Sequence, residues 1–153
     1  MRVKDYMLSD FCTISVHSTI AKALKRMVEE KTNSLVVVDD ESRPVGTLSS
    51  YTLVRNVVPP YLGNDPTYSQ FGKESVFEKY AEKIKDKKVL ELMHPDFHIL
   101  SENDSMIEAA TYSVMAERRI SPVVDDKGEL IGIITRTCIK NALFSTIFKD
   151  SIK

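Results

Sequence analysis

The feature that most constrains the fold of this chain is an internal duplication. When the sequence is shifted by 86 positions and laid on itself, its two halves align without a gap. The identical pairs include Val3 and Val89, Met7 and Met93, Asp10 and Asp96, Phe11 and Phe97, Ser15 and Ser101, Ala23 and Ala109, Val28 and Val114, Gly46 and Gly132, and the Val-Val-Asp-Asp runs at 37–40 and 123–126. One fixed offset indicates two copies of a unit of about 50 residues. A unit that small buries too little apolar surface to be stable alone, so we expect the copies to share a core.

Each copy is predicted to run strand, helix, strand, strand, helix. In the first copy the strands are expected at 12–16, 35–38 and 45–49, where β-branched residues gather. Ser18 is expected to cap the first helix, whose apolar stripe is Ile20, Ala23, Leu24, Met27 and Val28. A turn at 39–44 separates the last two strands, and a second helix follows them.

The second copy repeats this order. Strands are expected at 97–100, 122–124 and 131–135, with a turn at 125–129 that contains Gly128. Asp104 is expected to cap the helix, and Ser105 with Glu108 forms a potential capping box. The apolar stripe of this helix is Met106, Ala109, Ala110, Ser113 and Val114. The fold class is therefore α/β (α+β).

The connection between the copies is longer than packing requires. Prolines at 59, 60 and 66 predict a loop over 59–66. Ser75 with Glu78 resembles another capping box, and the helix behind it carries Val76, Phe77, Tyr80, Ala81 and Ile84 on one side. We favour a bridging helix that covers one edge of the molecule; a lid or partner-docking element is the alternative. The predicted division is 1–58 for the first copy, 59–87 for the connection and 88–150 for the second copy.

Composition excludes several classes of protein. The 153 residues are 42% apolar and 28% charged, which is ordinary for a soluble globular protein. A protein that binds nucleic acid usually has an excess of basic residues, so the net charge of −1 argues against a nucleic-acid partner. No apolar run reaches membrane-spanning length, and acidic Asp5 interrupts the opening segment, so no membrane association or signal peptide is expected. Two cysteines suit a reducing compartment, and we expect a cytoplasmic protein.

The order of these motifs resembles one known family, the CBS (cystathionine-β-synthase) domain pair, or Bateman module. The resemblance rests on the segments at 3–7, 13–14, 19–23, 34–39 and 45–49 in the first copy and on those at 89–93, 105–109, 120–125 and 128–135 in the second. It implies two βαββα repeats packed sheet to sheet with pseudo-twofold symmetry, and a regulatory, non-enzymatic module. Family members bind adenosine-containing ligands (AMP, ADP, ATP, S-adenosylmethionine or cyclic dinucleotides) in clefts between the repeats. The resemblance also implies a homodimer formed through helices and an effector protein of unknown identity. No cofactor is expected to be required, although an adenine nucleotide could be bound.

The resemblance also suggests which residues contact the ligand. A hydroxyl on the first strand corresponds to Thr13, and to Ile99 in the second copy. The start of the second strand corresponds to Asn33, Ser34 and Leu35, and to Arg119, Ile120 and Ser121. The family's ribose-binding Ser/Thr-x-x-Asp motif corresponds to Ser49 and Thr52, and to Thr135 and Cys138, with Arg136 adjacent.

Both copies lack the ribose-binding aspartate, which is a departure from the family pattern. A hydroxyl or thiol accepts hydrogen bonds less well than a carboxylate, and losing charge-assisted bonds costs about 1.5–3 kcal/mol, or roughly ten- to a hundredfold in affinity. Arg119 and Arg136 supply the planar donors that phosphate binding uses, whereas we expect Arg118 only to end the preceding helix. The alternative to ligand sensing is a protein-interaction or structural module whose clefts no longer bind nucleotide.

No catalytic residue or metal ligand is predicted. Cys12 is expected in a core position of the first strand and Cys138 on a helix, and with no Cys–His signature around either we favour structural packing for both. His94 and His98 could share a zinc ion only on a helix, and Pro95 opposes a helix there.

Overall fold

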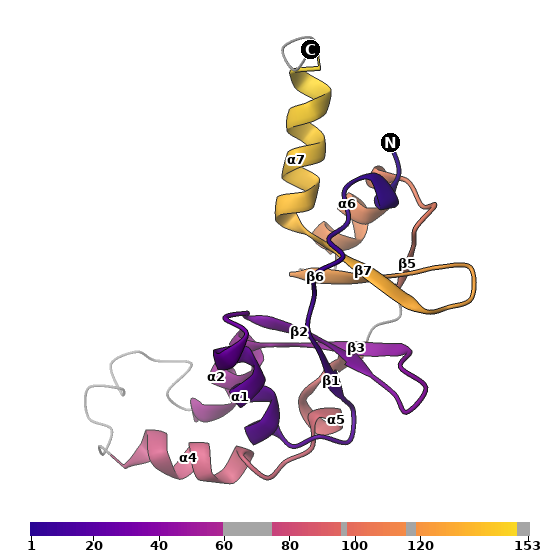
Figure 1. The fold of residues 1–153 in the computed structure, drawn as a ribbon. Coiled ribbons are helices and arrows are strands. Elements are labelled where there is room, and N and C mark those ends of the chain that lie inside the picture. The colour runs from indigo at the N-terminus through magenta and orange to yellow at the C-terminus, as the bar shows by residue number, and fades with distance from the viewer. Residues whose placement is uncertain (60–74, 96–97, 116–118, 150–153) are drawn as a thin grey trace.

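The computed structural model describes residues 1–59, 75–95, 98–115 and 119–149. It contains two copies of the predicted βαββα order (Figure 1), which confirms the fold class. The first copy comprises β1 (Thr13–Ser15), α1 (Ile20–Glu29), β2 (Ser34–Val38), β3 (Pro44–Ser49) and α2 (Ser50–Val57). The second comprises β5 (Leu100–Ser101), α6 (Met106–Met115), β6 (Ile120–Val124), β7 (Leu130–Thr135) and α7 (Arg136–Ile147). Four further elements lie outside this order: η1 (Val3–Asp5), α4 (Val76–Ile84), α5 (Val89–Leu92) and β4 (His94–Pro95).

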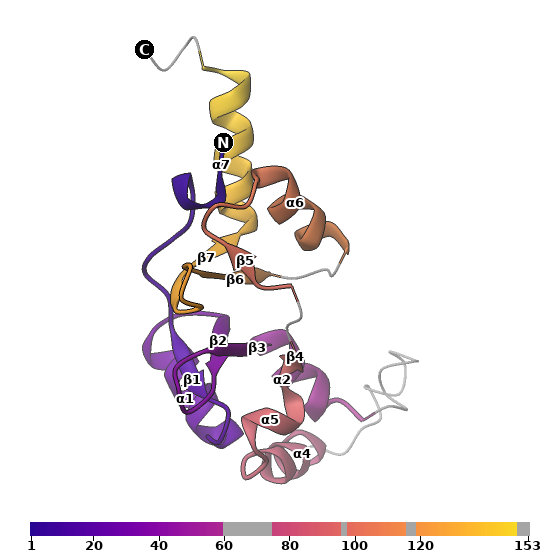
Figure 2. The ribbon, with the colours of Figure 1, turned by 90° about the vertical axis from the view of Figure 1, so that its right-hand side faces the viewer.

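The strands form two sheets with equivalent registers. In the first sheet, of order β1-β2-β3-β4, β1 runs parallel to β2, and Ser34 on β2 faces Ser49 on antiparallel β3. In the second, of order β5-β6-β7, Ile120 faces Thr135 in the same way. The two sheets lie as facing layers with the helices on their outer sides (Figures 1 and 2). This is the predicted sheet-to-sheet packing of two related units.

Apolar side chains fill three layers of the fold. One cluster, around Leu35 and Leu48, lies between the first sheet and its helices, and a second, around Leu100 and Ile134, does the same in the second copy. A third cluster of Val36, Ile120 and Ile133 lies between the sheets. Strand residues alternate between two buried faces, which explains the unbroken Val-Val-Val run of β2.

The opening segment of each copy packs into the other copy. Val3 is fully buried in the core of the second copy, and Val89, its partner at the 86-residue offset, is fully buried in the core of the first. The strand that follows α5 continues the exchange, because β4 pairs with β3 through Thr47 and His94. Each unit is therefore completed by residues from the opposite copy.

Two glycines allow this exchange. A Cβ atom on Gly46 would lie 2.6 Å from the carbonyl oxygen of His94, and one on Gly132 would lie 2.9 Å from that of Leu8. Both approaches are too close for any other residue without backbone movement. The lack of a side chain at Gly46 and at Gly132 thus leaves room for the exchanged segments.

The helix caps differ in part from those predicted. Thr19, and not Ser18, caps α1, because the backbone of Ser18 bonds to Ser15 and to Val89 and holds it in the preceding turn. Thr19 Oγ1 accepts from the N–H of Lys22 at 3.3 Å.

Two further predicted caps were wrong. The Asp104 carboxylate accepts from the N–H of Ser101 at 2.8 Å, so it stabilises the turn before α6. Ser105 caps that helix instead, accepting from the N–H of Glu108 at 3.3 Å. Ser75 already has helical dihedral angles and makes no capping bond, so the predicted capping box of α4 is absent.

The predicted helical stripes are buried only in part. Ala23 and Met27 lie in the core of the first copy, whereas Leu24 and Val28 are 49% and 69% exposed. The second copy matches this pattern, because Ala109 is buried and Val114 is 78% exposed. The apolar surface of these helices therefore extends beyond what the core covers.

The predicted turns are confirmed. Asp39 Oδ1 accepts from the N–H groups of Glu41 and Arg43, each at 2.9 Å. Asp125 Oδ1 makes the equivalent bonds to the second turn, in which Gly128 has a φ of 80°. These carboxylates take up N–H donors that the tight chain reversals leave unpaired.

The connection between the copies is described from residue 75 onward. Its helix α4 lies beside α2 and buries Ile84 in the core of the first copy (Figures 1 and 2), which agrees with a bridging role. The loop predicted over 59–66 lies outside the described residues from position 60. In the part of the chain that is described, no helix has the length and apolarity needed to cross a membrane.

Candidate ligand-binding cavity

A cavity of about 1260 Å³ lies between the two sheets and is lined by both copies. Six pairs of its lining residues are related by the 86-residue offset: Leu8 and His94, Asn33 and Arg119, Ser34 and Ile120, Thr47 and Ile133, Ser49 and Thr135, and Tyr51 and Thr137. Because both members of each pair line the same space, the cavity spans the pseudo-twofold axis of the molecule. The two walls carry different chemistry, since the paired residues differ in type.

The wall from the first copy carries hydroxyl and amide groups beside the charged residues Asp10, Glu30 and Arg55. Ser49 caps α2, and its Oγ accepts from the N–H of Thr52 at 3.3 Å and lies 3.2 Å from Thr52 Oγ1. The side-chain and backbone oxygens of Asn33 accept from Ser50, at 3.1 and 2.9 Å. These bonds hold the start of α2 against the start of β2.

The backbone at the start of β2 is already bonded. Thr32 Oγ1 accepts from the N–H of Ser34 at 3.3 Å and donates to the carbonyl of the same residue at 3.1 Å. Sequence comparison with the family directs attention to this backbone for base recognition. The Ser34 N–H is already bonded to a side chain of its own copy.

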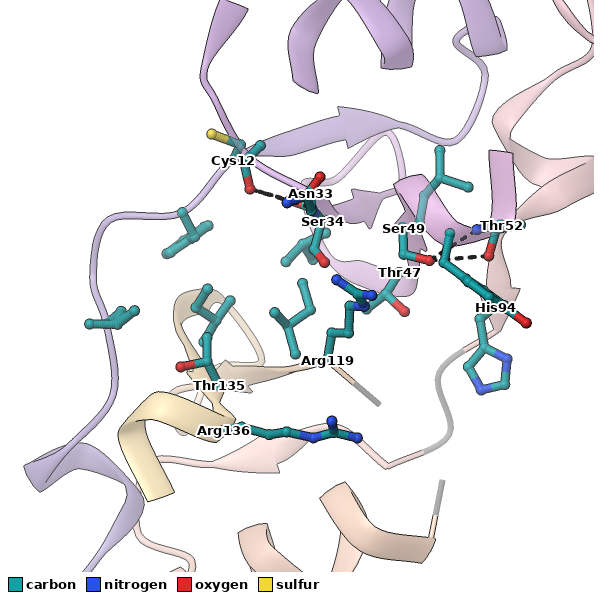
Figure 3. Close-up of a pocket in the computed structure, with 18 of the residues that line it drawn as sticks. Cys12, Asn33, Ser34, Thr47, Ser49, Thr52, His94, Arg119, Thr135 and Arg136 are labelled. Atoms are coloured by element: carbon teal, nitrogen blue, oxygen red, sulfur yellow. Dashed lines mark hydrogen bonds between the residues drawn. The ribbon is translucent and has the colours of Figure 1, made fainter. Parts of the chain in front are cut away.

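The wall from the second copy carries cationic side chains. Arg119 precedes β6 and Arg136 begins α7, and both line the cavity. In Figure 3 the Arg119 side chain extends towards Thr47 of the first copy, whereas the Arg136 side chain runs along the second copy. Neither forms an ion pair with any carboxylate among the described residues. Thr135 caps α7 by accepting from the N–H of Cys138 at 3.2 Å, and its Oγ1 lies 3.3 Å from the Cys138 sulfur.

The cavity brings together eight of the thirteen predicted site residues. They are Asn33, Ser34, Ser49, Thr52, Arg119, Ile120, Thr135 and Arg136. The other five, Thr13, Leu35, Ile99, Ser121 and Cys138, do not line it. Leu35 and Cys138 belong to the cores of their copies, and Ser121 is only 3% exposed. Arg118, which we expected only to end a helix, lies outside the described residues.

Sequence reasoning missed other residues of the cavity. Arg55 and Tyr51 stand one turn apart on α2, and Thr32 precedes β2. The acidic lining residues are Asp10 and Glu30. Helical spacing alone could have placed Arg55 beside Tyr51, but no sequence signal shows which face of α2 meets the cavity. No group of three or more His, Cys, Asp or Glu residues in the described ranges could hold a metal ion.

Comparison with known proteins gives one consistent result. The family model described as the CBS domain matches residues 3–59 and 89–145. The chain is 29% identical over 147 residues to the CBS domain-containing protein CBSX2, chloroplastic, of Arabidopsis thaliana, covering 86% of this chain but 60% of that protein. The chain therefore spans about three fifths of the length of that relative.

Solved structures agree with this similarity. A structure of CBSX2 from Arabidopsis thaliana superposes with a TM-score of 0.74 at 27% identity, covering 95% of each chain. Another, of CBSX2 in complex with AMP, gives a TM-score of 0.69 at 26% identity over 95% of this chain and 97% of that one. A CBS domain-containing protein from Kribbella flavida, at 24% identity, has the same fold with a TM-score of 0.74 over 95% of this chain and 99% of its own.

Proposed function

The chain belongs to the CBS domain family, as a tandem pair of repeats, and from this premise we propose that it is a regulatory module that binds an adenine-containing nucleotide in the cavity between its copies. One observation carries the proposal. The hydroxyl and amide groups of Asn33, Ser34, Ser49 and Thr52 from the first copy line the same cavity as two guanidinium groups from the second, those of Arg119 and Arg136. A nucleotide has the same division, with a neutral base and sugar at one end and phosphate at the other.

The proposed contacts follow from this division. Arg119 and Arg136 bind phosphate oxygens, because guanidinium donors match phosphate geometry and no described carboxylate neutralises them. Asn33 and Ser34 lie at the opposite wall, where the base would be read. Support for adenine comes from the CBSX2 structure with AMP, a relative at 26% identity.

Ligand-dependent thermal unfolding tests the proposal. AMP, ADP, ATP, S-adenosylmethionine and cyclic diadenylate would each be added to the purified protein. A ligand at a hundred times its dissociation constant should stabilise the folded state by about 2.7 kcal/mol. If none of them raises the unfolding temperature, adenine binding is wrong.

The site assignment is tested by substitution. Arg136→Ala should weaken phosphate-bearing ligands but leave adenosine unaffected, because it removes only the phosphate contact. Lys140→Ala is the matched control, since Lys140 is an exposed cation on the same helix that does not line the cavity. Equal loss of adenosine and nucleotide in Arg136→Ala would refute the assigned role.

A second candidate is a protein-interaction module whose cavity binds no nucleotide. The observation that favours it is the exposed apolar surface of the helices. On α7 and the residue after it, Leu143, Phe144, Ile147 and Phe148 are 46–62% exposed. Capture of one specific effector, unaffected by nucleotides, would support this function over ligand sensing.

The same surface supports a homodimer formed through the helices. The exposed apolar side chains on these helices include Leu24 and Val28 on α1, Val54 on α2, Ile107, Val114 and Met115 on α6, and Leu143, Phe144 and Ile147 on α7. Light scattering during gel filtration should give the dimer mass for the wild type and the monomer mass for Phe144→Ser. Phe77→Ser on α4 is the control, because Phe77 is 65% exposed but lies on the connection. A monomeric wild type would contradict the dimer.

We also propose a non-catalytic role in a reducing compartment, the cytoplasm. Both cysteines are free, which suits such a compartment. Localisation of the tagged protein in its own cells would test this placement.

A further inference from the structure

The hydroxyl groups at the helix starts are engaged in local bonds. A ribose diol is read by a group that accepts hydrogen bonds from its hydroxyls, most often a carboxylate. Ser49 Oγ already bonds to the N–H of Thr52 and shares a hydrogen bond with Thr52 Oγ1. Thr135 Oγ1 is occupied in the same way by Cys138. Neither helix start offers a strong free acceptor for a diol.

Few carboxylates that could accept from a ribose diol line this cavity. The acidic residues among its described lining are Asp10 and Glu30. Glu30 lies 4.0 Å from Arg26 Nη1, at the end of α1. Asp10 lies in the segment between η1 and β1, and it is the carboxylate of the described lining for which no ion pair is found among the described residues.

Guanidinium groups are more abundant. Arg55, Arg119 and Arg136 all line the cavity, and none is ion-paired with a carboxylate of the described residues. Each guanidinium carries five N–H donors in a planar array. Three such groups spread around a cavity of about 1260 Å³ fit a ligand with two or more phosphates.

We propose that this cavity recognises its ligand through phosphate groups and not through the ribose diol. The inference rests on the proposed function, because it specifies the class of nucleotide that the same cavity binds. The module should then bind ribo- and deoxyribonucleotides of equal phosphate content alike, and should favour ligands with more phosphates. A nucleoside polyphosphate and a cyclic dinucleotide both present this chemistry.

Isothermal titration in buffer without Mg²⁺ tests the inference, since Mg²⁺ would neutralise the phosphates. ATP and its 2′-deoxy analogue should bind within about threefold of each other, whereas AMP should bind at least about tenfold more weakly than ATP. Inorganic triphosphate should compete with ATP. Arg119→Gln and Arg136→Gln should reduce the difference between ATP and AMP, and Lys140→Gln should preserve it.

Cyclic diadenylate distinguishes the two sources of this chemistry, because it carries two phosphates but no vicinal diol. Binding tighter than that of ATP assigns the site to a cyclic dinucleotide, and weaker binding assigns it to a nucleoside polyphosphate; both results support phosphate recognition.

Two outcomes would overturn the inference. If deoxy-ATP binds about tenfold or more weakly than ATP, the diol is being read, and the proposed function stands while the inference fails. Asp10→Asn would then show whether Asp10 reads it, by removing the preference. If no adenine ligand binds, the proposed function and the inference fail together.

Discussion

Leu8 and Ile133 bond to each other through both backbone N–H groups, each at 2.9 Å, although they belong to different copies. At the 86-residue offset the same relationship recurs between His94 and Thr47, where β4 joins the edge of β3. The two copies are therefore joined by backbone pairing as well as by apolar contact.

Gly46→Ala is expected to destabilise the fold. The new Cβ would lie 2.6 Å from a backbone oxygen of His94, and this atom can give way only if β4 moves. Overpacking of this kind costs about 1–3 kcal/mol. Urea unfolding would measure the loss. Gly132→Ala, at the equivalent position, should lose a similar amount, and a neutral effect at both positions would contradict the close packing.

Val3→Ala is expected to destabilise the core of the second copy, because Val3 is fully buried there. Losing about two methyl-sized groups costs about 2 kcal/mol. Val28→Ala is the matched control, since Val28 is 69% exposed and should change stability by less than about 0.5 kcal/mol. Equal losses in the two variants would show that Val3 is not buried in the protein.

Asp125→Ala is expected to weaken the turn between β6 and β7. The Asp125 carboxylate accepts from the N–H groups of Lys127 and Glu129, at 2.9 and 3.0 Å, and both donors would lose this partner. Chemical unfolding should show a loss of about 1–2 kcal/mol. The neighbouring residue is exposed and provides the control, because Asp126→Ala should have almost no effect. If Asp125→Ala and Asp126→Ala unfold at the same denaturant concentration, the Asp125 carboxylate does not stabilise this turn.

Thr135→Ala is expected to shorten or fray the start of α7. Thr135 supplies the capping bond to the N–H of Cys138, and loss of such a cap costs about 1 kcal/mol. Hydrogen exchange should accelerate at the first turn of α7. Thr137→Ala, at an exposed position in the same first turn that makes no capping bond, should leave that exchange unchanged. If Thr135→Ala leaves hydrogen exchange at the first turn of α7 unchanged, Thr135 does not stabilise the helix start as a cap.

The order of elements could be predicted from the sequence, because hydrophobic periodicity and turn residues act locally. The buried run of β2 and the turns at Asp39 and Asp125 are examples. The cap of α1 was missed for a non-local reason, since Ser18 is held partly by Val89 from the other copy. The burial of Val3 could be inferred from its pairing with Val89, but periodicity does not show against which copy a side chain packs.

The residues of the candidate site could also be predicted only in part. The repeat offset and the family resemblance identified Arg119 and Arg136, which line the cavity, but gave no sign of Arg55 or of the bond between Thr32 and Ser34. Those features depend on the rotation of α2 and on the turn before β2. Contact of any of these residues with a ligand stays a prediction.

The exchanged segments also affect how the protein is made. Val3 N–H bonds to the carbonyl of Asp104, which lies 101 positions later in the chain. A ribosome that adds about 5–20 residues per second needs roughly 5–20 s to supply that partner. During this time the apolar opening segment has no site to enter, and the first copy lacks its Val89. Neither half can finish folding as it emerges, so the native structure forms only after the second copy has been synthesised.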